Sequence, residues 1–136
     1  HALLAPSDAG ATALHFAAAA GSASVVRWLL DAQGPSGATS AANLKDVHGT
    51  TAAHWAARSG STKVLQALKE SGAQLDAVDT YCACQPLHLF AGEGHLEAIQ
   101  WLVSEGSVDI HARDGLGRTA EDWASGHSQV AVAEWL

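Results

Sequence analysis

Cysteine and histidine are the residues of this chain whose types and spacing could support metal or redox chemistry. Cys82 and Cys84 are separated by one residue, and His88 follows closely. Zinc usually takes four Cys or His ligands at CxxC or longer spacing, so this set would need a fourth ligand, such as His48. Because a free cysteine usually behaves as a small hydrophobic residue, we interpret the pair as part of an ordinary turn. Zinc binding and redox sensing are the alternatives.

The sequence contains no motif that specifies a catalytic nucleophile together with its base. It lacks G-x-S-x-G and H-E-x-x-H, and GEGH at 92–95 follows no predicted strand, so it does not indicate nucleotide binding. The acidic side chains fall mainly on predicted turns and solvated faces. We therefore predict that the chain is not an enzyme, requires no cofactor and holds no metal.

Length and composition indicate one ordered globular domain. The chain has 136 residues, of which 48% are hydrophobic and 15% charged. Its net charge of −7 argues against binding to nucleic acid, and no apolar run is long enough to span a membrane. Two cysteines one residue apart provide no disulfide framework, which favours a reducing, cytoplasmic (intracellular) location.

An internal repeat determines where the polar residues must lie. Four stretches of about 20 residues align, and they begin at Gly10, Gly49, Cys84 and Gly117. Equivalent positions, at separations of 39, 34 and 34 residues, hold His15, His54, His88 and Asp122. A pattern of this period predicts a stack of similar units in which neighbours cover each other's apolar faces.

Each unit is predicted to contain two short helices. In the second unit, Thr51 can cap a helix that runs to about Arg58, and Gly60 ends it. A second helix is predicted from about Thr62 to Glu70, with apolar residues spaced for one buried face. No segment alternates long enough to predict a sheet, so the fold class is all-α.

The first two units are further apart because of an insertion at residues 33–42 (QGPSGATSAA), which carries no charge. Its Gly, Ser, Ala and Pro content predicts a flexible surface loop. We expect that shortening it to the length of the other connections changes stability by about 1 kcal/mol or less, because loop-closure entropy varies slowly with length.

The repeated motifs resemble the ankyrin repeat. The start of each unit reads TALH (12–15), TAAH (51–54), QPLH (85–88) and TAED (119–122), followed by small residues, a glycine and a hydrophobic helix. The departures are Ala for Pro in three motifs, Gln85 for Thr, Asp122 for His, and one extra residue within 79–88.

This resemblance implies a solenoid of stacked helix-turn-helix pairs with β-turn fingers. The repeats would span about 7–42, 43–75, 76–110 and 111–136 of a single domain, 1–136. It also implies that His15, His54 and His88 hydrogen-bond neighbouring backbone and tie the repeats together. Asp122 is expected to keep only a local hydrogen bond near Thr119.

The five tryptophans occupy two recurring positions. Trp55 and Trp123 align with Phe16 and Leu89, whereas Trp28, Trp101 and Trp135 align with Ala67. We interpret both as packing positions between repeats, where truncation of a fully buried Trp to Ala would cost about 3–5 kcal/mol. Binding of a ligand by these rings is the alternative.

The resemblance implies a protein-binding scaffold or adaptor whose concave surface combines fingers and first helices. Position within the repeat predicts the residues of this surface: Val47, His48, Thr50, Arg58, Thr80, Tyr81, Cys82, Glu93, Leu116, Arg118 and His127. Val47, Tyr81 and Leu116 would form an apolar patch, with Arg58 and Arg118 as anchors. The first unit offers only Asp8, Ala9, Ala11, Ala19 and Ala20, a nearly featureless wall. The alternative is that all of these are ordinary exposed finger residues.

A second function is a targeting or spacer segment of a larger enzyme or multi-subunit assembly. The chain starts on His1 without a methionine and stops on the apolar pair Trp135 and Leu136. Repeat stacks need polar caps for solubility, so we expect further repeats or domains at both ends.

Overall fold

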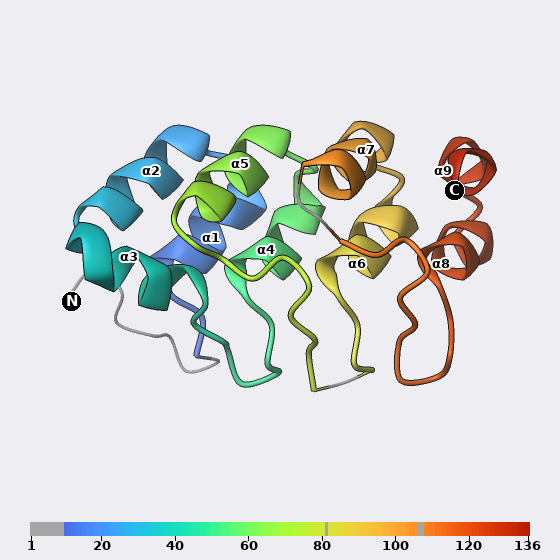
Figure 1. Ribbon diagram of the computed structural model, residues 1–136, viewed down its shortest axis with the longest axis horizontal. Coiled ribbons are helices and arrows are strands. Elements are labelled where there is room, and N and C mark those ends of the chain that lie inside the picture. Colours follow the sequence, from blue (N-terminus) through green and yellow to red (C-terminus); the bar gives the residue numbers. More distant parts are fainter. Residues whose placement is uncertain (1–9, 81, 106–107) are drawn as a thin grey trace.

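The chain folds into two rows of helices with finger-like connections on one side (Figure 1). The computed structural model describes residues 10–80, 82–105 and 108–136. The first-row helices are α1 (Ala13–Ala20), α4 (Ala52–Trp55, continued by a 3-10 turn at Ala56–Arg58), α6 (Pro86–Glu93) and α8 (Ala120–Gly126). The second-row helices are α2 (Ala23–Asp31), α5 (Thr62–Glu70), α7 (Leu96–Ser104) and α9 (Val130–Trp135). No β-strand occurs among the residues described, so the all-α prediction is confirmed.

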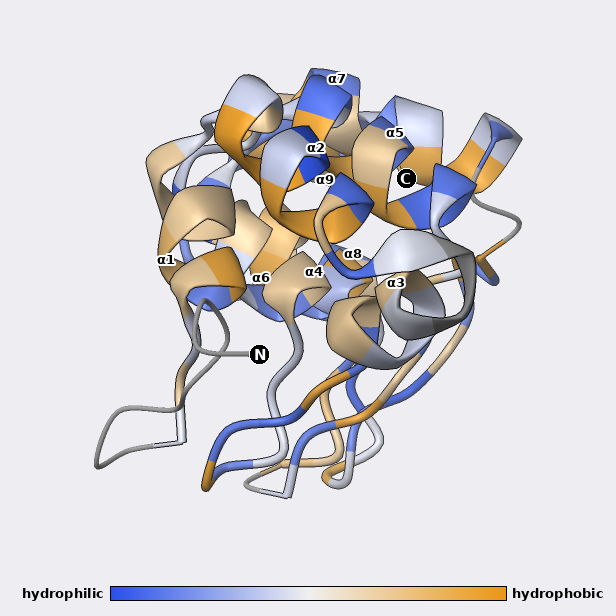
Figure 2. Cartoon of the chain, turned by 90° about the vertical axis from the view of Figure 1, so that its left-hand side faces the viewer, coloured by the Kyte–Doolittle hydropathy of each residue, from blue (hydrophilic) through white to orange (hydrophobic). Residues whose placement is uncertain are grey.

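The core lies between the two rows, where the apolar sides of the second-row helices face the first row (Figure 2). In α5, the spacing of Val64, Leu65 and Leu68 puts all three on one face, and none of them is exposed. The Ser61 hydroxyl oxygen accepts the Val64 N–H at 3.2 Å and so caps the start of α5. The helix predicted from Thr62 to Glu70 is therefore confirmed.

The predicted loop at 33–42 is wrong, because most of this segment is a helix, α3 (Gly34–Ala42). A proline stands in its first turn, a position where the missing N–H carries no penalty. The helix packs against α2, and Ala41 and Ala42 are buried in the main core. The Thr39 hydroxyl donates to the Ser71 carbonyl at 2.9 Å. The segment is therefore part of the packed structure.

The tryptophans are less buried than their alignment with core residues predicts. Trp28 is 59% exposed and Trp135 is 42% exposed, while Trp55, Trp101 and Trp123 are half-buried against the core. The expected loss of 3–5 kcal/mol required complete burial, so it applies to none of the five. Alignment with a buried residue at the same repeat position therefore does not mean that a tryptophan is buried, because one side of the repeat faces solvent.

None of the helices described in this structure is both long enough and apolar enough to cross a membrane.

Candidate functional site

Three fingers connect successive units, and we number them by their closing residues: the first at 46–50, the second at 79–84 and the third at 114–118. Each is closed by an aspartate N–H that donates to a carbonyl, of Thr50 at 3.0 Å, Cys84 at 3.1 Å and Arg118 at 2.8 Å. Neighbouring fingers are also bonded to each other, since the Thr80 N–H donates to the His48 carbonyl at 2.8 Å. The Gly115 N–H donates to the Cys82 carbonyl in the same way. The fingers therefore form a continuous layer.

A buried carboxylate joins the third finger to its first-row helix. One oxygen of Asp114 accepts the N–H groups of Leu116 and Arg118, each at 2.9 Å, and the other accepts the Trp123 indole N–H at 2.8 Å. Burial raises the pKa of Asp114, but these hydrogen bonds outweigh burial and hold the pKa well below its usual range. Asp46 holds the first finger similarly, with the Trp55 indole N–H at 3.1 Å.

Three buried histidines link each unit to the next. The Nδ1 atoms of His15, His54 and His88 accept the N–H groups of Thr12, Thr51 and Gln85 at 3.0, 3.1 and 3.0 Å. Because Nδ1 accepts, the proton of the neutral ring lies on Nε2. The Nε2–H groups then donate to the carbonyls of Thr50, Cys84 and Ala112 at 3.2, 2.9 and 3.0 Å.

The role expected for the histidines is therefore confirmed, and so is the local bond of Asp122. Its carboxylate accepts the Thr119 N–H at 3.0 Å. The fourth unit thus keeps the local half of the histidine arrangement.

We expect the stability of the fold to decrease as the pH falls below about 6.5. Burial lowers the pKa of His15 and His54 from the ordinary value of 6.5. The unfolded chain therefore binds more protons than the folded chain below that pH, and stability present above it is lost. Urea unfolding at pH 7.5, 6.5 and 5.5 measures this, and the decline should be smaller in a His54→Gln variant. A midpoint that stays constant over this range would contradict the prediction.

A row of large side chains crosses the first-row helices beside the fingers. It consists of the residues that follow the histidine position: Phe16, Trp55, Leu89 and Trp123. Phe16 is 53% exposed and meets Trp55 edge to face, with ring centroids 5.3 Å apart. The side chains of Thr50, His54, Trp55, Arg58 and Leu89 line a hollow of about 220 Å³. We call the surface made by this row, the hollow and the fingers the finger-side face.

Comparison with known proteins agrees with this repeated geometry. Family models described as ankyrin repeats match residues 1–79 and 87–136. The chain belongs to the ankyrin repeat family. Ankyrin repeats are generally protein–protein interaction modules. No curated protein matches the chain.

Most of the residues predicted for the ankyrin binding surface are accessible. The exposed ones are Val47, His48, Arg58, Thr80, Glu93, Leu116, Arg118 and His127, while Thr50 and Cys82 are half-buried. Tyr81 lies outside the residues described. The structure brings Thr50 and Arg58 together at the hollow, and it gathers Arg118 and His127 around Trp123.

Arg118 is exposed, but contacts within the protein hold its side chain more firmly than would suit an anchor for a partner. Its Nε–H donates to Asp114 at 2.8 Å, and its guanidinium lies 5.0 Å from the centre of the Trp123 ring. Arg58 is exposed and forms no ion pair with the described residues. Arg58 is therefore the better placed of the two predicted anchors.

Sequence reasoning missed the row of large side chains. The first unit was expected to be featureless, yet it presents Phe16, and Ala11 of the expected wall is buried. Asp8 and Ala9 fall outside the residues described. The recurrence of Phe, Trp and Leu after the histidine position was visible in the sequence. It was assigned to the core because the alignment does not reveal which side of a short helix faces solvent.

The zinc ligands considered from the sequence are also corrected. Both ring nitrogens of His88 are occupied by hydrogen bonds, so His88 cannot be a ligand without breaking the link to Ala112. Cys82 and Cys84 are joined in a disulfide, with Cα atoms 5.2 Å apart, inside the range that a disulfide spans. A bridge between residues two positions apart does not tie separate segments together, so it provides no disulfide framework, and the intracellular location stays a prediction.

Proposed function

We propose that this chain is a protein-binding scaffold or adaptor module that holds its partner on the finger-side face. The observation that carries the proposal is the hollow between the second and third units. An aromatic ring, an aliphatic side chain and a guanidinium that forms no ion pair with the described residues meet there at the surface. Aromatic and arginine side chains around a recess are typical of the residues that dominate protein interfaces.

The chemistry of the hollow indicates the kind of segment that it would accept. Trp55 and Leu89 provide apolar walls, and Arg58 provides the charge at the edge. The Thr50 hydroxyl already donates to Asp46, and the Trp55 indole N–H is shared between these two residues. We therefore propose a partner segment with an apolar side chain for the hollow and a neighbouring carboxylate for Arg58.

The fingertips would extend this contact. Val47 is 60% exposed and Leu116 is 75% exposed, so each presents an apolar side chain to solvent beyond the hollow. Tyr81, which was predicted between them, stays part of the proposal as a sequence-level prediction. The proposal keeps the module non-enzymatic and intracellular.

Reversal of the charge at Arg58 tests this directly. Peptides selected on the wild-type chain from a random peptide display library should lose at least about tenfold in affinity for Arg58→Glu, because an anchor residue contributes about 1.4 kcal/mol or more. Val47→Asp combined with Leu116→Asp should weaken the same peptides. Lys63→Glu is the matched control, since Lys63 is an exposed cation on the second-row helix α5. Fluorescence polarisation measures the affinities.

Two outcomes would count against the proposal. In the first, the selected peptides bind Arg58→Glu as tightly as the wild-type chain. In the second, they lose equal affinity for Arg58→Glu and Lys63→Glu. The first result would place the binding site elsewhere. The second would show that affinity depends on the overall charge of the chain and not on Arg58. Absence of any finger-sensitive binder would favour the spacer function instead.

A further inference from the structure

The second finger differs in length from the two fingers beside it. In the first and third fingers, the closing carbonyl lies four residues after the aspartate, at Thr50 and Arg118, but in the second finger it lies five residues after Asp79, at Cys84. The extra residue places two cysteines in the turn, at 82 and 84. The segment 80–86, which contains both, lies between the two family matches and belongs to neither.

The carboxylate of Asp79 is oriented like its equivalents but lacks one of their partners. Its Oδ1 atom accepts the N–H groups of Cys82 at 3.1 Å and Cys84 at 3.2 Å. In the other two fingers, the second carboxylate oxygen accepts a tryptophan indole N–H. The equivalent residue here is Leu89, which has no donor, and Asp79 Oδ2 accepts no hydrogen bond from any described residue. One oxygen is thus fixed by the backbone while the other is uncommitted.

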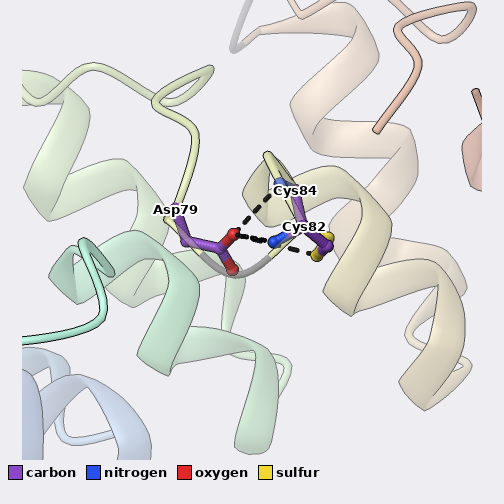
Figure 3. A group of neighbouring side chains, drawn as sticks. All are labelled: Asp79, Cys82 and Cys84. Carbon is purple, nitrogen blue, oxygen red and sulfur yellow. Dashed lines mark hydrogen bonds between the residues drawn. A yellow bond between two sulfur atoms is a disulfide. The ribbon is translucent and has the colours of Figure 1, made fainter. Parts of the chain in front are cut away.

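Both sulfur atoms lie beside this carboxylate (Figure 3). One ligand atom each from Asp79, Cys82 and Cys84 can be chosen so that all three lie within 4.8 Å of one another. Cys82 Sγ is 3.7 Å from Asp79 Oδ1, Cys84 is fully buried, and Asp79 is only 9% exposed. Tetrahedral zinc places its ligand atoms about 3.3–3.8 Å apart, given Zn–S near 2.3 Å and Zn–O near 2.1 Å. The two sulfur atoms are bonded to each other here, so cleavage of the disulfide and rotation of the two cysteine side chains would separate them to this spacing beside the carboxylate.

We propose that, once the disulfide is reduced, Asp79, Cys82 and Cys84 bind one thiophilic divalent cation, Zn²⁺ or Cd²⁺. The disulfide is the closed state that excludes the metal. Two thiolates select a soft or borderline ion over Mg²⁺ or Ca²⁺, which prefer oxygen ligands. The backbone N–H groups on Oδ1 orient the carboxylate, as hydrogen-bond donors to a metal ligand commonly do. Water would fill the fourth position.

The site would form in two steps, reduction of the disulfide by a small dithiol and then binding of the cation. A small dithiol transfers two electrons and two protons to the Cys82–Cys84 bond, forming its own cyclic disulfide and leaving two protein thiols. The divalent cation then displaces both thiol protons, which are released to solvent. In the oxidised chain both cysteines are in the disulfide, so no thiolate is available to bind the metal. Metal binding by this finger is thus conditional on reduction, and it uses Asp79, Cys82 and Cys84, none of which lines the hollow.

The experiment is a cadmium titration of the whole chain, in the disulfide form and after reduction and removal of the reductant without oxygen. For the reduced chain we expect one Cd²⁺ per chain, the ultraviolet charge-transfer band of cadmium–thiolate bonds, and release of protons. The disulfide form carries the same histidines and carboxylates, so it is an internal control, and it should show no band.

Single substitutions assign the ligands. Cys82→Ser and Cys84→Ser should each abolish the band, and Asp79→Asn should weaken cadmium affinity at least about tenfold. Asp76→Asn, at an exposed neighbouring aspartate, is the matched control and should change nothing. Far-ultraviolet circular dichroism verifies folding. If Asp79→Asn unfolds, the two serine variants, which keep Asp79, decide the result. Equal cadmium binding by the reduced wild-type chain and either serine variant would overturn the proposal.

Discussion

Replacement of His54 by alanine is expected to lower the free energy of unfolding by about 3–4 kcal/mol. His54 is 2% exposed, and its ring joins the Thr51 N–H in its own unit to the Cys84 carbonyl in the next. Alanine would leave a buried donor and a buried acceptor without partners, at about 1–3 kcal/mol each, and would add a cavity. Because the lost bond connects two units, unfolding should also become less cooperative.

Asp122→Ala is the matched control for this substitution. Asp122 occupies the same repeat position, but it is exposed and bonds only within its own unit, to Thr119. We expect it to cost about 1 kcal/mol or less, as for loss of an exposed helix cap. Urea unfolding followed by circular dichroism measures both variants. A loss for His54→Ala no larger than that for Asp122→Ala would show that the bond between units contributes nothing.

The helix pairs and the histidine links could be predicted because both follow from local rules repeated along the chain. Apolar spacing, a capping residue such as Thr51 and a glycine such as Gly60 determine each helix from its own neighbourhood. The histidine position was recognisable from the recurrence of the motifs TALH, TAAH and QPLH. Because the same local pattern occurs four times, signals that are weak individually were together sufficient to predict the fold.

The insertion and the tryptophans were misjudged because tertiary contacts decide them. Gly, Ser and Pro in 33–42 indicate a loop by composition, but burial of Ala41 and Ala42 against neighbouring helices stabilises a helix there. Trp28 aligns with the buried Ala67, yet it is mainly exposed. An alignment of repeats compares positions and carries no information on how far a larger side chain extends from the core.

The exposed finger residues of the candidate site could be predicted from the sequence, but the contacts between units could not. Finger residues such as Val47 and Leu116 are exposed, as their positions in the repeat predicted. The hollow was not foreseen, because it requires Arg58 of one unit to meet Leu89 of the next. Likewise, the approach of Asp79 to both cysteines depends on the one-residue lengthening of the second finger. Contacts between units and changes in finger length lie outside what a repeat motif specifies.

The correction at α3 leads to a second large effect. Ala42→Asp is expected to lower the free energy of unfolding by about 3 kcal/mol or more, because it places an unpaired carboxylate in the core. Ala42 is 1% exposed. Ser40→Asp adds the same charge to the exposed side of the same helix and should change stability by about 0.5 kcal/mol or less. Comparison of the two variants separates the effect of burial from the effects of helix propensity and net charge. Urea unfolding measures the stability of each variant.

Removal of α3 should agree with the point substitutions. Joining residue 33 to Asn43 through a short glycine–serine link removes Ala41 and Ala42 from the core and the Thr39 bond to the Ser71 carbonyl. It also loosens Asn43, whose side chain donates to the Gly72 carbonyl at 3.1 Å and accepts the Gln74 N–H at 2.7 Å. A loss of at least about 2 kcal/mol follows from two buried side chains and these bonds. Equal stabilities for Ala42→Asp and Ser40→Asp, together with a deletion cost of about 1 kcal/mol or less, would instead restore the flexible loop that composition predicts.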